Sequence, residues 1–326
     1  LTCSDWRYLT SMTRYESRAA SRFTSERLQQ RQRLADANVS EPSIGFVGAG
    51  KVGTALARTW ARAGFRIKAV CSRKGFSSAS IAEELGALAV VSPTDVLSQS
   101  DLTVLAVPDD AISSVVQSFS TSEWHGKAVI HTSGVHSSEV LAVLAERGAM
   151  TGSLHPAYPF SGRDIGSVIP SGVTFAIESD HQQLAEWLST LVEAAEGVSI
   201  TLRPESKTLY HAALTLTSNY TVSLFAASKK ILTGLGANDA SAEAVLVRLL
   251  QGTIENLSLQ GTPRALTGPL LRGDVGTVDA HLTALSGWPE ILAVYVALAR
   301  LTLPLIAEQG LATDGIRQVL MNWEGK

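Results

Sequence analysis

The sequence predicts an α/β protein: a doubly wound parallel sheet followed by an all-helical C-terminal domain. Three observations lead to this prediction. Short apolar runs alternate with amphipathic helical segments from Ser43 to Leu202, a Gly-rich turn follows the first apolar run, and only long helical stretches follow Arg203-Pro204. Strands that read as continuous apolar runs are typical of a parallel sheet covered by helices on both faces. We therefore expect one domain over residues 41–203 and a second over 204–326.

The individual elements follow from the period of the apolar residues. The predicted strands are Ile44–Val47, Ile67–Cys71, Leu88–Val91, Leu102–Val107, Ala128–His131, Thr151–Leu154, Val173–Ile177 and Val198–Leu202. The predicted helices between them are Lys51–Ala63, Ser78–Leu85, Asp110–Phe119, Ser137–Arg147 and His181–Ala195. In the second domain they are Glu205–Thr233, Ala240–Gln260, Val275–Leu285 and Pro289–Gln309.

Composition narrows the class of protein. The 326 residues carry a net charge of -3, which gives no reason to expect nucleic acid as a partner. The two cysteines fit a reducing compartment, so we expect a cytoplasmic protein. An apolar run at 291–299 is interrupted by Arg300 and Pro304, and it is too short to span a membrane. We interpret it as a buried helix.

The first 40 residues differ from the rest of the chain. They contain seven Arg, no Lys, four acidic residues and little apolar periodicity. We interpret residues 1–40 as a disordered or non-native extension, with a transit peptide as the alternative. The acidic residues count against the alternative.

The turn after the first strand has the spacing G-x-G-x-x-G. Because it follows a strand and opens a helix, the pattern predicts a dinucleotide-binding turn of the Rossmann type. One glycine allows the tight turn, the second lets a pyrophosphate approach, and the third lets the helix pack closely. The N-terminus of the helix attracts the phosphates. The predicted contacts are Gly48, Ala49, Gly50, Lys51, Val52 and Gly53.

The residues after the second strand predict which dinucleotide binds. An NAD site carries an acid there to bind the ribose 2′-hydroxyl, whereas this strand ends in Ser72-Arg73-Lys74. A hydroxyl and two cations suit a 2′-phosphate, so the prediction is NADP(H). The alternative is a solvated basic loop. Val107 and Pro108, at the end of the fourth predicted strand, should also line the cofactor site.

Candidate catalytic residues also follow strand ends. Ser133 follows the fifth predicted strand, and His155 follows the sixth. Hydride transfer to a carbonyl or imine needs a proton donor, for which His155 is the candidate, with Ser133 orienting it or the substrate. Both residues could instead stabilise turns. The neighbouring His125, His131 and His136 lack metal-ligand spacing, so we expect no metal.

The helical domain contributes further candidates. Lys207, His211, Thr215 and Asn219 recur every four residues, which places them along one helix face. We favour His211 and Asn219 as catalytic residues over Lys207, which we assign with Arg272 to substrate binding. The alternative for the helix face is a solvated surface, and for Arg272 it is a role in holding its loop.

Four stretches carry a resemblance to a known family: IHTSGVHSSEVL, GSLHPAYPF, LYHAALTLTSNYTVSLF and ALTGPLLRGDVGTVDAHLTAL. Together with the turn they resemble Rossmann-like proteins with a C-terminal helical domain of unknown function. That family is similar to pyrroline-carboxylate reductase, ketopantoate reductase, prephenate dehydrogenase and deazaflavin-dependent NADP oxidoreductases. Prephenate dehydrogenases place Ser and His where Ser133 and His155 stand. The resemblance implies a helical domain like the C-terminal domain of 6-phosphogluconate dehydrogenase.

We therefore expect an NADP(H)-dependent oxidoreductase that acts on a small carbonyl, hydroxy or imino acid, with ketopantoate-like reduction as an analogy. We also expect a homodimer and no membrane partner. Two alternatives stay open: a dinucleotide-binding sensor or scaffold without catalysis, and a reductase that uses a deazaflavin.

Overall fold

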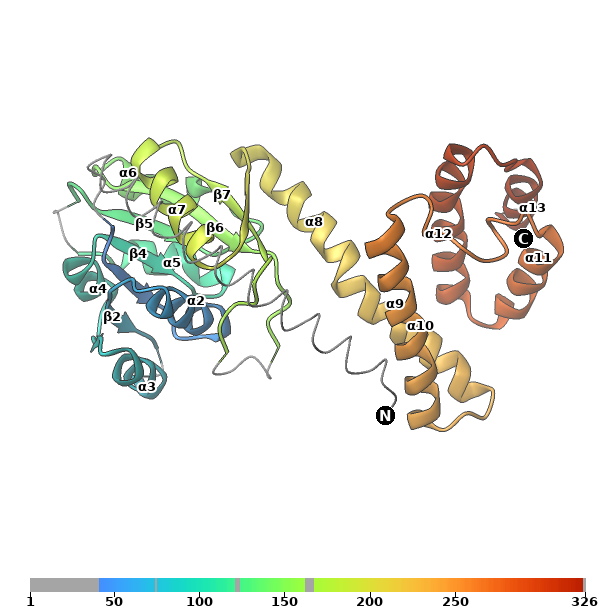
Figure 1. Ribbon diagram of the computed structural model, residues 1–326, viewed down its shortest axis with the longest axis horizontal. Coiled ribbons are helices and arrows are strands. Elements are labelled where there is room, and N and C mark those ends of the chain that lie inside the picture. The colour runs from blue at the N-terminus through green and yellow to red at the C-terminus, as the bar shows by residue number, and fades with distance from the viewer. Residues whose placement is uncertain (1–40, 74, 121–123, 162–166, 325–326) are drawn as a thin grey trace, which may run out of the picture. The chain divides into compact units, whose positions relative to one another are not determined.

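The computed structural model describes residues 41–324 except 74, 121–123 and 162–166 (Figure 1). The expectations for residues 1–40 and for Lys74 lie outside the described residues. The chain divides between Leu216 and Thr217 into two compact units. This division falls later than the boundary expected near residue 203, because the first helix after the sheet is counted with the first unit.

The first unit contains an eight-stranded sheet in the order β3-β2-β1-β4-β5-β6-β7-β8. Its first six positions have the strand order of a Rossmann fold. The strands are β1 (Ile44–Val47), β2 (Ile67–Cys71), β3 (Leu88–Ala89), β4 (Leu102–Leu105), β5 (Ala128–His131), β6 (Met150–Pro156), β7 (Thr174–Glu178) and β8 (Val198–Thr201).

Two strands depart from the predicted parallel sheet, because β7 and β8 both run in the direction opposite to β1–β6. β7 pairs with β6 in the antiparallel direction, whereas all other neighbours are parallel. β7 starts beside the end of β6, with Phe175 opposite Pro156, so the chain returns without crossing the sheet. The apolar pattern of a strand carries no information on its direction, which is why the prediction was wrong here.

Helices cover both faces of the sheet. Helices α2 (Lys51–Arg62) and α7 (Gln182–Ala194) pack on one face, in a core with Ile44 and Phe46 of β1. Val47, the next residue, faces a second core. That core is shared by α4 (Pro93–Gln99), α5 (Ile112–Gln117), the 3-10 turn η2 (Ser138–Leu141) and α6 (Ala142–Ala145). Helix α3 (Gly75–Leu85) lies beside β2 and β3.

The single helix predicted over Glu205–Thr233 is two helices. After the 3-10 turn η4 (Pro204–Ser206), α8 runs over Lys207–Thr217 and α9 over Asn219–Gly234. They are separated at Ser218, whose backbone has φ -95 and ψ -68. Ser and Asn are weak helix formers, and no Gly or Pro marks this break in the sequence.

The second unit is helical, as predicted. Helix α9 packs against α10 (Asp239–Gln260). Helices α11 (Val275–Ala284), α12 (Pro289–Glu308) and α13 (Asp314–Glu324) share a separate apolar core, with the 3-10 turn η5 (Leu285–Gly287) between α11 and α12. Helix α13 was not predicted.

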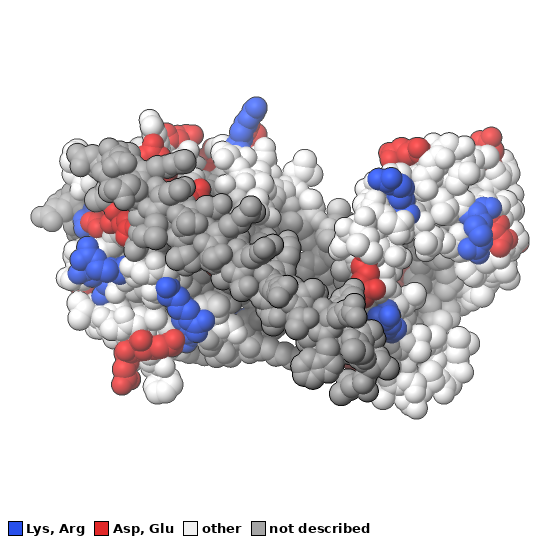
Figure 2. Space-filling model, in the orientation of Figure 1, with Lys and Arg blue, Asp and Glu red and all other residues white. Residues whose placement is uncertain are grey.

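The expectation that the apolar run in α12 is buried was wrong. By length and composition α12 could cross a membrane, and 17% of its 18-residue apolar window is buried within this chain. Within the predicted run, Val294 and Leu298 are 44% and 41% exposed, whereas Ala299 is buried. On the face shown in Figure 2, the described surface of the second unit carries only scattered charged side chains. Several apolar side chains of this unit are therefore exposed within this chain.

Candidate functional site

The Gly-rich turn joins β1 to α2, and two of its glycines are required by close packing. Gly48 has φ +108, in the region that favours glycine, and a Cβ there would overlap the carbonyl oxygen of Ala106. The Gly48 N–H donates to the Cys71 carbonyl at 2.8 Å, which ties the turn to β2. A Cβ on Gly53 would overlap the Gly48 carbonyl oxygen. This glycine therefore lets α2 start directly against the turn.

Gly50 differs from both neighbours. A Cβ there would meet no heavy atom within 4 Å among the described residues, and its backbone is extended. The space beside Gly50 is open. Gly50 is the N-cap of α2, and because it has no side chain it makes no capping hydrogen bond. The first N–H groups of a helix have no partner within the helix and attract anions. The turn therefore fits the phosphates of a dinucleotide.

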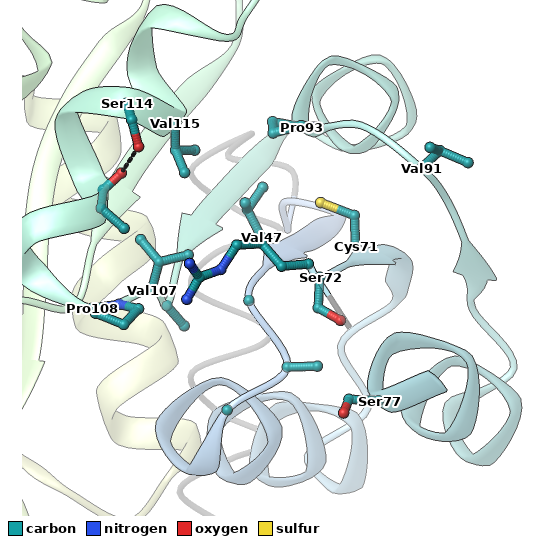
Figure 3. A pocket seen from close by; sticks show the side chains of 16 residues that line it. Val47, Cys71, Ser72, Ser77, Val91, Pro93, Val107, Pro108, Ser114 and Val115 are labelled. Carbon is teal, nitrogen blue, oxygen red and sulfur yellow. Dashed lines mark hydrogen bonds between the residues drawn. The ribbon is translucent and has the colours of Figure 1, made fainter. Parts of the chain in front are cut away.

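A cavity of about 680 Å³ opens beside this turn (Figure 3). It lies where the strand order reverses, between β1 and β4. Val107 and Pro108 lie on one side of it, and Ser77 and Val91 on the other. The predicted residues on its lining are Gly48, Ala49, Gly50, Ser72, Arg73, Val107 and Pro108. Lys51, Val52 and Gly53 belong to the first turn of α2 and are not on this lining.

The structure adds cavity residues that the sequence did not indicate. Ser77 of α3 and Ser114 of α5 contribute hydroxyls, and Cys71 contributes a thiol. Burial raises the pKa of Cys71 to about 11, so this thiol is unreactive at neutral pH. Only the fold brings these residues together, because they come from three elements.

A second group of side chains lies at the ends of β5 and β6. His155 Nδ1 is 3.1 Å from the hydroxyl of Tyr210 on α8, and the His155 and His211 rings are 6.1 Å apart between centroids. Both rings pack closely against Gly134, because a Cβ on this residue would lie 2.5 Å from His211 Cδ2 and 2.9 Å from His155 Nε2. The fold therefore brings His155, His211 and the Ser133-Gly134 turn together.

The buried environment keeps His155 neutral. Burial, reinforced by the charge of Lys207, lowers the pKa of His155 to about 4. Burial also raises the pKa of Tyr210 to about 12, so its phenol stays protonated and can donate to Nδ1. Because Nδ1 accepts this hydrogen bond, the single N–H proton of the neutral imidazole is on Nε2.

His131 is also neutral, with a structural role. Its Nε2 lies 3.1 Å from the Ser137 carbonyl, and its Nδ1 accepts the Ser133 N–H at 3.2 Å. Burial lowers the pKa of His131 to about 4. Both ring nitrogens therefore hold the Ser133 turn in place.

Lys207 is the most deeply buried of the candidate residues, at 1% exposure. Its Nζ donates to the Ser133 carbonyl at 2.9 Å and to Ser153 Oγ at 2.8 Å. Burial lowers the pKa of Lys207 to about 8, against the opposing effect of the Glu178 and Asp109 carboxylates. An ammonium has three N–H donors, and two of them are used by these partners among the described residues.

Ser133 makes the contacts of a turn residue, and its orienting role stays a prediction. Its hydroxyl accepts the N–H groups of Val135 and His136 at 3.2 and 3.1 Å, and its side chain is buried. This is the turn role that was left open as the alternative. Asn219 begins α9 in the second unit, and Arg272 is exposed there, so both assignments stay predictions.

Sequence reasoning missed Tyr210, Ser153 and Glu178. Ser153 precedes His155 by two residues on β6, a spacing that puts both side chains on one face of the sheet. Glu178 ends the otherwise apolar β7, and an acid in that position was a visible signal.

Two family comparisons agree with this architecture. Residues 28–156 match a Rossmann-like domain, and residues 173–302 match a domain of unknown function, DUF2520. The chain thus combines a Rossmann-like domain with a DUF2520 C-terminal region, as the resemblance implied. No curated protein sequence matches the chain significantly.

Solved structures share the fold at low sequence identity. A protein from Bacteroides fragilis assigned as an NADP oxidoreductase has 23% identity and a TM-score of 0.61, over 80% of this chain and 96% of that one. A pyrroline-5-carboxylate reductase from Streptococcus pyogenes has 18% identity and a TM-score of 0.58, over 82% and 97%. A reductive aminase from Aspergillus terreus, in complex with NADPH and ethyl levulinate, has 16% identity and a TM-score of 0.57, over 87% and 93%.

Proposed function

We propose that this protein is an NADP(H)-dependent oxidoreductase that transfers a hydride to or from a small carbonyl, hydroxy or imino acid. The observation that carries the proposal is the cavity beside Gly50, which is lined by the open face of the Gly-rich turn and by Ser72 and Arg73. The related folds of NADP-dependent reductases support it.

The choice of NADP(H) over NAD(H) rests on charge. Arg73 lines the cavity at the end of β2, next to Ser72, where an NAD site would carry a carboxylate. A guanidinium binds a phosphate through two parallel hydrogen bonds, and each charge-assisted bond is worth more than a neutral one. Bound NADP(H) would supply or accept the hydride.

The cluster around Gly134 supplies the polar groups for the other half of the reaction. Reduction of a carbonyl adds one hydride to carbon and one proton to oxygen, and oxidation reverses both. With a pKa of about 4, His155 is neutral at neutral pH, holds no extra proton and can donate a hydrogen bond through Nε2. Lys207, with a pKa of about 8, does hold one. We assign His155 to the substrate oxygen and Lys207 to the proton that this oxygen takes up.

A turnover screen tests the proposal. The full chain would be incubated with NADPH and a panel of keto acids, aldehydes and cyclic imines, while nicotinamide absorbance is followed. The proposal expects consumption of NADPH with at least one class and a large loss of rate in His155→Ala. If the protein binds NADPH but turns over nothing in the panel, the result would support a dinucleotide-binding sensor or scaffold without catalysis. If consumption of NADPH requires an added deazaflavin, the result would support a deazaflavin-dependent reductase.

The exposed apolar side chains of the second unit support a homodimer. On α10, Val245 and Leu249 lie four residues apart on one helix face, are 60% and 67% exposed, and both line an open cavity. Contiguous exposed apolar surface marks interaction sites. We propose a second copy of this chain as its partner, because homodimers are the commonest assembly of such chains.

The mass of the particle in solution tests the dimer. Light scattering should give twice the chain mass for the wild type and a concentration-dependent shift towards monomer for Leu249→Glu. Lys68→Glu, at an exposed position of β2 outside this surface, serves as the control for added negative charge. A monomer of the wild type at micromolar concentration contradicts the proposal, and pelleting with lipid vesicles would point to a membrane instead.

A further inference from the structure

We propose that Ser153 and Glu178 are positioning residues that act on the reaction through Lys207: they hold its ammonium against the Ser133 carbonyl and keep it charged. The proposal deepens the proposed function, because Lys207 matters to the reaction only if this protein moves a hydride and a proton. It assigns a role to the buried carboxylate of Glu178.

The two residues are neighbours across the antiparallel pair of strands. Ser153 of β6 lies directly opposite Glu178 of β7 in the register. Residues that face each other in this way have neighbouring side chains on one face of the sheet. Ser153 is fully buried and Glu178 is 2% exposed, so water does not compete for either group.

The hydrogen bonds between them have a defined direction. Ser153 Oγ lies 3.0 Å from Glu178 Oε2, and a carboxylate can only accept, so the serine hydroxyl donates its proton to Glu178. The lone pairs of Ser153 Oγ are then free to accept from Lys207 Nζ at 2.8 Å. Lys207 therefore donates to Ser153, and Ser153 donates to Glu178. This series of hydrogen bonds connects the ammonium of Lys207 to the carboxylate of Glu178.

Glu178 also has a second set of contacts, with the turn after β5. Its Oε1 accepts the Ser138 hydroxyl at 2.7 Å, and both carboxylate oxygens accept the Ser138 N–H, at 2.9 and 3.0 Å. These bonds fix the carboxylate in its buried position. They also provide a control, because Ser138 contacts Glu178 without contacting Lys207 among the described residues.

The charged and titratable groups around Lys207 act in opposite directions. The carboxylates of Glu178 on β7 and Asp109 in the 3-10 turn η1 (Asp109–Ala111) favour the ammonium. His155 on β6, His131 on β5 and His211 on α8 also lie around it, and the first two are neutral. Asp109 is on the exposed side of the unit, so the buried Glu178 is the carboxylate with the least screening by water.

The consequence is a specific shift in the titration of Lys207. Removal of the Glu178 charge takes away a group that favours the ammonium, so the pKa of Lys207 should fall. Removal of the Ser153 hydroxyl breaks the connection between the two groups and should shift it in the same direction. Loss of the Ser138 hydroxyl should leave it in place.

The test is the NMR titration of Lys207 in protein labelled with lysine carrying carbon-13 at Cε. The Lys207 signal is identified by its absence from Lys207→Met. We expect the midpoint to fall by about one pH unit in Glu178→Gln and in Ser153→Ala. In Ser138→Ala the midpoint of the Lys207 titration should move by less than about a third of a pH unit. Ser153→Ala removes only a hydroxyl, so it serves if Glu178→Gln does not fold.

Two results would overturn the proposal: an unchanged Lys207 midpoint in Ser153→Ala, or an equal shift in Ser138→Ala, which would show a purely structural role. The activity readout is separate. The pH at which kcat/KM for reduction declines should move down with the Lys207 midpoint. If the wild type turns over no substrate, the proposed function fails, while the NMR titration still decides whether Ser153 and Glu178 control Lys207.

Discussion

The Nζ of Lys207 donates a hydrogen bond to the main-chain carbonyl of Ser133 over 2.9 Å, which joins the first residue of α8 to the turn after β5. Gly134, the next residue of that turn, packs against the rings of His155 and His211. A lysine from the helix that follows the sheet is thereby fixed beside two histidines.

Lys207→Met should lower kcat by roughly 10²–10⁴-fold, the usual contribution of a positioned acid or base. NADPH affinity should stay unchanged, because Lys207 does not line the cavity beside Gly50. In the wild type, kcat/KM for reduction should decline as the pH rises through about 8, because the ammonium loses its proton there. Steady-state kinetics against pH measure both. Lys68→Met, at an exposed position of β2, is the control. If the wild type, Lys207→Met and Lys68→Met share one dependence of kcat/KM on pH, the role of Lys207 is contradicted.

Substitutions of two glycines in the turn should have different effects, with Gly48→Ala lowering stability and Gly50→Ala weakening cofactor binding. Gly48→Ala should lower the free energy of unfolding by roughly 1–3 kcal/mol, because φ is positive and the Cβ would overlap a carbonyl. Gly50→Ala has room for its Cβ and should cost less than about 1 kcal/mol. It should nevertheless weaken NADPH binding about tenfold or more, since the added carbon occupies the approach to the phosphates. Chemical denaturation and fluorescence titration give the two values, and tight binding by Gly50→Ala would place the phosphates elsewhere.

Acid should destabilise the protein through its buried histidines. The pKa of His131 is lowered to about 4 in the folded chain, whereas an unfolded histidine titrates near its ordinary 6.5. Between these values the unfolded state binds more protons, so stability falls as the pH drops from 6.5 to 4. His131 should contribute at most roughly 3 kcal/mol to that fall. Urea unfolding at several pH values should show a shallower slope for His131→Gln than for the wild type, while the exposed His125→Gln keeps the wild-type slope.

Gly134→Ala tests whether the histidine cluster is needed for turnover. The new methyl group would push on His211 Cδ2 and on His155 Nε2, so one or both rings must move. We expect a loss of kcat of about tenfold or more with unchanged NADPH affinity, because small displacements of catalytic groups are costly. Gly287→Ala, where a Cβ meets no described heavy atom within 4 Å, is the matched control. Full activity in Gly134→Ala would remove His155 and His211 from the reaction.

The parts of the fold that local patterns determine could be predicted from the sequence. Strands β1, β2 and β5 have the predicted bounds, because each is a short apolar run between turn residues. Helix α4 was missed, although Ser92 and Asp95 form a capping box at its start, with Pro93 at its first position. This local capping signal is enough to predict α4 from the sequence.

Other features depend on contacts between distant segments. The direction of β7 and the break at Ser218 leave no mark in the apolar periodicity. The burial of Lys207 depends on Ser133, Ser153 and Glu178, which come from three separate segments of the chain. A four-residue spacing on a helix placed Lys207 and His211 on one face, but it could not show that the lysine is the buried member.

A fluorescence titration of the wild type and Arg73→Ala with NADPH and with NADH tests the central claim most directly. The account predicts that the wild type binds NADPH more tightly than NADH. It also predicts that Arg73→Ala loses roughly 10–100-fold in affinity for NADPH, the value of a charge-assisted contact, and little for NADH. Binding of neither dinucleotide, or equal binding of both without any effect of Arg73→Ala, would contradict it.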